Sequence, residues 1–136
     1  MIGILIVTHG DFGKELIRSA ELIVGKQENT LALGLFHGDN IDVFREKIAE
    51  YIKKLDNEEG LLIFTDLYGG SPSNAIAINA KRITDVRFKC ITGVNLPMVL
   101  EALTMRKTLE LNQLKEYCME MAHQGIKDLN KAIELK

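Results

Sequence analysis

The 136-residue sequence predicts an α/β fold, a doubly wound three-layer sandwich around a mainly parallel sheet of four strands. Apolar runs of strand length alternate four times with segments of helical apolar spacing, a pattern typical of a sheet covered by helices on both faces. The first and third runs, 2–7 and 61–64, show no polar alternation, so we expect both strands to be buried on both faces. Each run ends in a polar corner, which contains His9 in the first case and Asp66 in the third.

The first half of the chain is expected to form strand, helix, strand and helix. The first helix should cover about 11–24, because its apolar residues share one face and Gly25 can end it. A second strand over 30–36 runs into a polar turn with His37 and then into a helix over 41–55. No residue beside His37 looks like a chemical partner, so we interpret it as a loop residue and keep a position lining the site as the alternative.

The second half repeats the pattern. After the strand at 61–64, Ser71 is the expected N-cap of a third helix, with Pro72 at its first position. The fourth strand, over 86–90, alternates apolar with basic residues, which predicts a half-exposed strand at or near a sheet edge. Asn95 is then expected to cap a short helix.

The end of the chain is expected to form one long helix. Residues 106–110 leave two structures open, a loop or a brief strand. The last helix begins at about Leu111, and Gly125 marks a kink or a close contact within it. Its apolar face is expected to continue beyond that glycine through Ile126, Leu129 and Ile133.

Composition excludes several classes of protein. The length suits one domain over 1–136, and 17 basic against 19 acidic residues leave a net charge of −2, without the basic footprint of a nucleic-acid-binding protein. The apolar start has no basic leader and no small-residue cleavage site, and no apolar run is long enough to span a membrane. We therefore expect a cytoplasmic protein without direct membrane insertion.

The cysteines and histidines do not predict a metal site. Cys90 and Cys118 lie far apart, outside any CxxC pattern, and are interpreted as reduced core residues. The three histidines show no metal-ligand spacing. We therefore expect neither a metal nor a cofactor.

A strand order of 2-1-3-4 would bring His9 and Asp66 face to face across the crevice where ligands of open α/β sheets bind. A carboxylate that accepts the N–H of an imidazole fixes its tautomer, leaves the opposite nitrogen nucleophilic, and stabilises positive charge on the ring. Gly69, Gly70, Ser71 and the helix N-terminus behind them supply N–H groups and a dipole suited to phosphoryl oxygens. The pattern therefore points to a phosphohistidine.

Other phosphoryl chemistries fit less well. A nucleotide kinase needs a phosphate cradle with lysine and a magnesium site, but the chain has no GxxxxGK[ST] and no second acidic residue beside Asp66. A signalling receiver domain needs paired acids after its first strand, where this chain has His9 with only Asp11 nearby. A phosphohistidine that is loaded by another protein and passed on requires none of these groups.

Three stretches carry a resemblance to a known family. They are Thr8–Gly10, Thr65–Asn74, which reads Thr-Asp-Leu-Tyr-Gly-Gly-Ser-Pro-Ser-Asn, and Gly93–Met98, which reads Gly-Val-Asn-Leu-Pro-Met. In this order and at these intervals they resemble the mannose-family enzyme IIA component of the bacterial phosphoenolpyruvate-dependent sugar phosphotransferase system. The likeness covers nearly the whole chain. A phosphocarrier of dihydroxyacetone kinase systems shares the general fold, but Gly-Gly-Ser-Pro and Val-Asn-Leu-Pro resemble the mannose type better.

The resemblance implies a phosphotransferase component that works through a phosphohistidine. His9 would accept the phosphoryl group from the phosphocarrier protein HPr and pass it to a histidine of the IIB component, with Asp66 orienting the ring and Ser71 near the phosphoryl group. It also implies a homodimer that exchanges an antiparallel edge strand, for which 106–110 is the candidate. The rim of the site would include Thr8, Gly10, Tyr68 and Asn95.

A regulatory module remains the alternative function. Such a protein would keep the fold and the histidine, but its phosphorylation would control another protein rather than feed a transporter. The transported sugar is not predicted, because the IIA component does not touch it.

Overall fold

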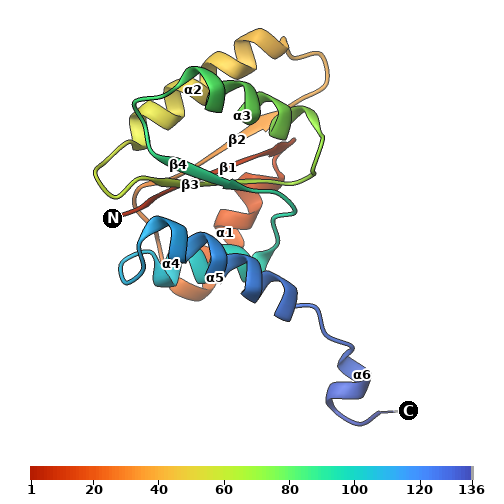
Figure 1. Ribbon diagram of the computed structural model, residues 1–136. Coiled ribbons are helices and arrows are strands. Elements are labelled where there is room, and N and C mark those ends of the chain that lie inside the picture. The colour runs from red at the N-terminus through yellow and green to blue at the C-terminus, as the bar shows by residue number, and fades with distance from the viewer. Residues whose placement is uncertain (136) are drawn as a thin grey trace.

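The computed structural model describes residues 1–135 and contains a four-stranded sheet between two layers of helices (Figure 1). The strand order is β2-β1-β3-β4 and all three neighbouring pairs are parallel, so the predicted fold class and strand order are confirmed. In chain order the elements are β1 (Gly3–His9), α1 (Phe12–Val24), β2 (Thr30–Leu35), α2 (Ile41–Leu55), β3 (Leu61–Thr65), α3 (Ser71–Arg82), β4 (Phe88–Ile91), α4 (Leu96–Met105), α5 (Leu111–Gln124) and α6 (Leu129–Ala132).

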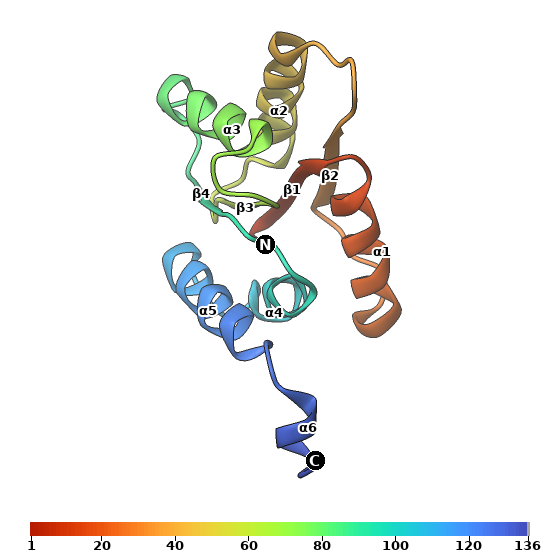
Figure 2. The ribbon, with the colours of Figure 1, turned by 90° about the vertical axis from the view of Figure 1, so that its right-hand side faces the viewer.

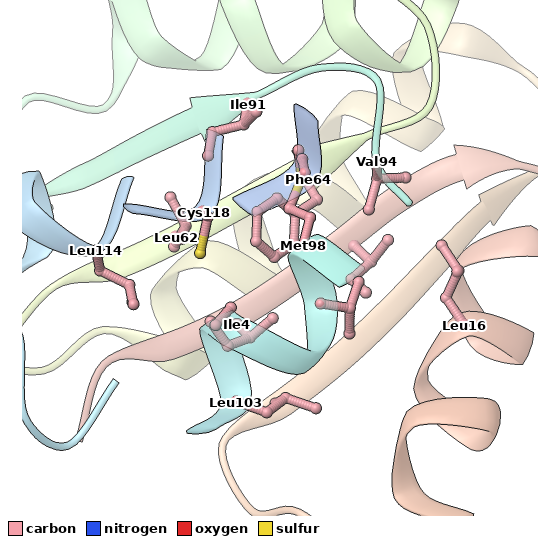
Figure 3. Close-up of a cluster of buried hydrophobic side chains, with 14 of the residues drawn as sticks. Ile4, Leu16, Leu62, Phe64, Ile91, Val94, Met98, Leu103, Leu114 and Cys118 are labelled. Atoms are coloured by element: carbon pink, nitrogen blue, oxygen red, sulfur yellow. The ribbon is translucent and has the colours of Figure 1, made fainter. Parts of the chain in front are cut away.

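The sheet separates two apolar cores. Helices α2 and α3 cover one face, and α1, α4 and α5 cover the other (Figure 2). Along β1, Ile4 and Ile6 enter the core beneath α4 and α5, while Leu5 and Val7 enter the core beneath α2 and α3, and all four side chains are fully buried. Figure 3 shows Ile4 in the first of these cores, among side chains of β3, α4 and α5. Burial on both faces explains the unbroken apolar run of β1.

Strand β4 lies at the edge of the sheet, as its alternating pattern predicted. Phe88 and Lys89 are half-buried and Cys90 is exposed, so the expectation of a core position is wrong for Cys90. The other cysteine, Cys118, is buried in α5 beneath the sheet. Burial raises the pKa of its thiol to about 12, which makes it unreactive at neutral pH.

The start of α3 differs from the prediction by one residue. Gly70, not Ser71, is the N-cap, and Ser71 is the first helical residue, with Pro72 following it. The carbonyl of Gly70 accepts the first helical hydrogen bond, from the N–H of Asn74 at 2.9 Å. Because glycine has no side chain, no side-chain cap covers this end of the helix.

The last helix is shorter than predicted. It ends at Gln124, and the expected continuation of its apolar face is wrong, because Ile126 is 76% exposed, Leu129 67% and Ile133 54%. A Cβ on Gly125 would lie 2.7 Å from Cγ of Pro97, so the predicted close contact is present at this glycine. Beyond it the chain leaves the sandwich, and α6 projects away from the sheet (Figure 1).

Residues 106–110 form the connection between α4 and α5 and contain no strand, so the loop is the correct alternative. Arg106 is 1% exposed, and its guanidinium donates to the carbonyls of Ile2, Glu28 and Asn29 and to the side chain of Gln27. These bonds tie Arg106 into its own chain. The exchange of this segment between two copies stays a prediction.

The carboxyl edge of the sheet depends on a close backbone contact at Gly34. This residue pairs with Thr8, and a Cβ at position 34 would lie only 2.0 Å from the carbonyl oxygen of Gly10. Side-chain rotation does not relieve this clash, because the backbone sets the position of the Cβ and the carbonyl oxygen of Gly10 is itself a backbone atom. Gly34 therefore allows the connection between β1 and α1 to lie directly against β2.

We expect Gly34→Ala to lower the free energy of unfolding by about 3 kcal/mol, because the connection after β1 must shift. Gly38→Ala is the matched control: it places alanine at a positive φ of 87° but meets no atom within 4 Å. It should cost only about 1 kcal/mol. Urea unfolding of both variants measures the difference, and a Gly34→Ala variant as stable as the unsubstituted protein would contradict the clash.

Candidate functional site

His9 and Asp66 meet at the carboxyl ends of two neighbouring strands. Val7 of β1 pairs with Thr65 of β3, so the residues that follow leave the sheet side by side. Nδ1 of His9 lies 2.8 Å from Oδ2 of Asp66, and the backbone N–H of His9 donates to the same oxygen at 3.0 Å. One carboxylate oxygen therefore holds both the ring and the backbone of the histidine.

Asp66 is held as an ionised acceptor. Its second oxygen, Oδ1, accepts the N–H of Leu67 at 3.0 Å, and its side chain is 12% exposed. Burial alone would raise its pKa, but the hydrogen bonds from the backbone and ring of His9 outweigh burial and lower the pKa from 3.8. The carboxylate is thus charged throughout the neutral range.

The lowered pKa of Asp66 also links the site to acid stability. A carboxyl group with a lower pKa in the folded than in the unfolded chain stabilises the fold above its unfolded value, here 3.8. That contribution is lost as the pH falls through the folded-state pKa. Neutral and mildly acidic solutions therefore leave the contact between His9 and Asp66 in place.

An ionised carboxylate on Nδ1 fixes the tautomer of His9. Nδ1 carries the proton and donates it, so Nε2 has the free lone pair. The side chain is 48% exposed, and within residues 1–135 Nε2 has no hydrogen-bond partner. The site thus presents an oriented, accessible nitrogen nucleophile.

The N-terminus of α3 lies against this ring. A Cβ on Gly70 would lie 3.2 Å from Cε1 of His9, the ring carbon between the two nitrogens. The first turn of α3 has no side-chain cap and no acidic residue, so its positive dipole is not compensated by a neighbouring carboxylate. The end of this helix is suited to bind anionic oxygens beside His9.

His9 opens into a cleft of about 560 Å³ at the carboxyl edge of the sheet. Its walls come from the connections after β1 and β2, the start of α2 and the start of α3. The lining residues are His9, Gly10, Leu35, Phe36, His37, Gly38, Asp39, Ile41 and Ser71. This cleft is where a group attached to Nε2 would meet a partner molecule.

Residues 1–135 contain neither a metal-binding cluster nor a membrane-spanning helix. No group of three or more histidine, cysteine, aspartate and glutamate side chains is arranged to hold a metal ion. Across the same residues, no helix combines the length and the apolar composition needed to cross a membrane.

A family model described as "PTS system fructose IIA component", of the mannose-type EIIA family, matches residues 3–119. This match covers both polar corners of the site and most of the fold. The chain belongs to the mannose-family IIA components of the phosphotransferase system. The resemblance on the three sequence motifs is thereby confirmed.

Relatives of this IIA family cover nearly the whole chain. The chain is 34% identical to the fructose-specific EIIA component of Bacillus subtilis over 134 residues. This alignment covers 98% of this chain and 90% of that protein. The chain is also 35% identical over 131 residues to the mannose-specific EIIAB component of Escherichia coli K12, covering 94% of this chain but only 39% of that protein. The names of these relatives specify different sugars, so they do not decide the sugar for this chain.

Solved structures of IIA proteins share the fold. A phosphotransferase system component EIIA from Streptococcus agalactiae superimposes with a TM-score of 0.88 at 31% identity, covering 96% of this chain and 99% of that one. A PTS IIA protein associated with the fucose utilization operon of Streptococcus pneumoniae gives a TM-score of 0.80 at 27% identity, covering 96% and 95%. As a IIA component, the chain is a phosphotransferase component with a phosphocarrier role in a sugar phosphotransferase system.

Six residues of the predicted IIA site do not line the cleft of His9; two of them, Asp66 and Gly70, lie against the His9 ring instead. Thr8 is fully buried, and its hydroxyl accepts the N–H of Gly13 at 2.9 Å. Tyr68 and Gly69 line a neighbouring groove between α3 and β4. Asn95 caps α4 and donates to the carbonyl of Ala122, beside a third cavity. Gly10 and Ser71 do line the cleft, and Gly70 borders the ring.

One residue of the cleft, His37, was interpreted from the sequence as a loop residue, with a position lining the site as the alternative. His37 does lie in a loop, but that loop forms a wall of the cleft that contains His9. The signal that could have found it was the predicted strand order, which places the end of the second strand beside the end of the first.

Proposed function

We propose that the chain accepts a phosphoryl group from phospho-HPr on Nε2 of His9 and passes it to the IIB component of a mannose-family sugar transporter. The contact between Nδ1 of His9 and the ionised Asp66 carries this proposal, because it leaves Nε2 as an oriented nucleophile. Membership of the IIA family supports the same role.

In the proposed transfer the lone pair of Nε2 forms a bond to phosphorus. The bond between phosphorus and the histidine nitrogen of HPr breaks, and its electron pair returns to that imidazole. His9 keeps the proton on Nδ1, so its ring becomes positively charged while Asp66 stabilises the charge through the 2.8 Å contact. The N-terminus of α3, with Gly70 and Ser71, binds the phosphoryl oxygens. In the transfer to IIB, a histidine nitrogen of IIB forms the new bond to phosphorus. The bond between phosphorus and Nε2 of His9 breaks, and its electron pair returns to Nε2.

Exposed apolar side chains around the strand ends support docking by protein partners. They follow β1, β2 and β3 or begin the helices there. The set comprises Phe12 (47% exposed), Phe36 (49%), Ile41 (41%), Leu67 (58%) and Tyr68 (91%). Clustered exposed aromatic and aliphatic side chains are typical of protein–protein contact surfaces.

Incubation with phosphoenolpyruvate, enzyme I and HPr tests the first half of the proposal. Intact mass should show one added phosphoryl group that is acid-labile, and fragment masses should place it on His9. A chase with an unphosphorylated IIB component should then remove it. Absence of any modification on the folded protein would contradict the proposal, and a phosphoryl group that no IIB component accepts would favour the regulatory alternative.

We also propose a homodimer in which the C-terminal segment of one copy covers the free edge of β4 in the other. The edge strand leaves backbone groups unpaired, and a groove of about 520 Å³ runs between it and α3. The apolar side chains of Ile126, Leu129 and Ile133 project into solvent within one copy. A partner copy would bury them.

Replacing Ile126, Leu129 and Ile133 together by serine should convert the dimer into a monomer, because it removes the apolar area that the partner buries. Sedimentation equilibrium measures the change. The matched control is Leu22→Ser with Ile23→Ser, which alters two exposed apolar residues on α1 (89% and 63%) and should leave the dimer intact. A dimer that survives the triple substitution would contradict this assignment.

A further inference from the structure

His37 lies in a hydrogen-bonded turn that lines the cleft of His9. Leu35 pairs with His9 in the sheet, and the N–H of Gly10 donates to the carbonyl of Leu35 at 2.8 Å. The next residues form a turn in which the N–H of Asp39 donates to the carbonyl of Phe36 at 3.1 Å, and the N–H of Phe36 donates to Oδ2 of Asp39 at 2.8 Å. This turn places His37 just beyond the strand end that lies beside His9.

The turn has the geometry of a type II β-turn, with glycine at its third position. Gly38 has a φ of 87°, which favours glycine there, and His37 occupies the second position of the turn. The residue is exposed, and within residues 1–135 its ring makes no hydrogen bond or ion pair. Its imidazole is therefore available to a group that enters the cleft.

The charges of the cleft give that imidazole a distinct role. Within the described part of the chain, neither lysine nor arginine is among its lining residues. His37 is thus the one lining imidazole besides His9 itself. A phosphoryl group on Nε2 carries close to two negative charges and three acceptor oxygens, to which an imidazole N–H can donate.

The other charged groups around the turn do not replace His37. Asp39 lies in the same turn, and its Oδ2 accepts the N–H of Phe36. Lys47 of α2 lines a different pocket, which Asp39 also lines. Asp42, in the first turn of α2, pairs with Arg45. From β3, Asp66 reaches the cleft through the His9 ring, and α3 contributes only the uncharged Ser71 to the lining.

We propose that the imidazole of His37 donates a hydrogen bond to the phosphoryl group carried by His9 and thereby favours the phosphorylated state of the protein. This inference rests on the proposed function, because it requires a phosphoryl group on His9. It gives His37 a role in binding the phosphoryl oxygens rather than in the transfer itself.

The test compares equilibrium phosphorylation at a fixed ratio of phospho-HPr to HPr, measured by intact mass. His37→Ala should lower the equilibrium constant for phosphorylation about fivefold, the scale of one partly exposed hydrogen bond to a charged group. His37→Lys should restore loading, because lysine also supplies N–H donors for the phosphoryl oxygens.

His123→Ala is the matched control, since His123 lines a separate cavity between α5 and the connection after β4. It should load to the same extent as the unsubstituted protein. If His37→Ala loads as well as the unsubstituted protein, the inference is wrong while the proposed function stands. If the unsubstituted protein itself never gains a phosphoryl group, the proposed function fails first.

Discussion

His9→Ala is expected to abolish phosphoryl acceptance from phospho-HPr completely. The substitution removes Nε2, the free nitrogen that Asp66 orients at the open cleft. The fold should survive, because the His9 side chain is 48% exposed and its backbone N–H can still donate to Asp66. Intact mass after incubation with the complete phosphoryl-donating system measures the loss, and far-ultraviolet circular dichroism verifies the fold.

His123→Ala serves as the control for this experiment, since it removes an imidazole from another cavity. It should accept one phosphoryl group at the normal rate. Phosphorylation of folded His9→Ala to the same extent as the unsubstituted protein would show that another residue is the acceptor. The contact between His9 and Asp66 would then have no role in phosphoryl acceptance.

Asp66→Asn is expected to slow phosphoryl acceptance by about 100-fold or more, by analogy with other histidines that depend on a carboxylate. Three N–H groups point at the Asp66 carboxylate, two from His9 and one from Leu67. An amide has one oxygen and one NH₂ group. In Asp66→Asn the NH₂ group therefore replaces one of the two accepting oxygens and faces an N–H donor of His9 or Leu67. The charge that stabilises the loaded ring is lost in either orientation.

The orientation of the amide in Asp66→Asn decides which tautomer His9 adopts and whether the N–H of Leu67 keeps its acceptor. If its NH₂ group faces His9, Nδ1 must accept, the proton moves to Nε2, and the nucleophilic lone pair is lost. If it faces Leu67, the tautomer is kept but a backbone N–H loses its acceptor. Nitrogen-15 chemical shifts of the His9 ring distinguish the two tautomers.

Asp11→Asn makes the same change of charge close to His9 and is the matched control. Asp11 is the N-cap of α1, but its side chain makes no capping hydrogen bond. Stopped-flow rates of transfer from phospho-HPr should fall for Asp66→Asn and stay close to normal for Asp11→Asn. Equal rates in both variants would contradict the orienting role of Asp66.

Local patterns were sufficient to predict the strands that hold the site. A strand buried on both faces must be apolar at every position, so β1 and β3 leave unbroken runs that end where the chain reaches the polar edge. The corners that contain His9 and Asp66 were therefore visible before any tertiary contact was known. The alternating pattern of β4 likewise placed it at the edge.

Local patterns failed where a residue's environment comes from another part of the chain. The apolar spacing of Ile126, Leu129 and Ile133 suits a buried helix face, but the chain leaves the sandwich after Gly125 and exposes them. Cys90 was expected in the core, yet the edge position of β4 exposes it. Spacing along the chain does not tell whether a second surface is available to bury such residues.

The sequence by itself determined the alternation of strands and helices, and with it the two corners that bear His9 and Asp66. Tertiary structure decided which corner groups meet: strand register brings Nδ1 of His9 to Asp66, Gly34 admits the backbone of Gly10, and the turn after β2 carries His37 to the same cleft. The spacing of apolar residues along the chain indicates which side chains are buried, because burial depends on each residue's own surroundings. Distances between segments that are far apart in the chain depend on register and packing, which no local pattern contains.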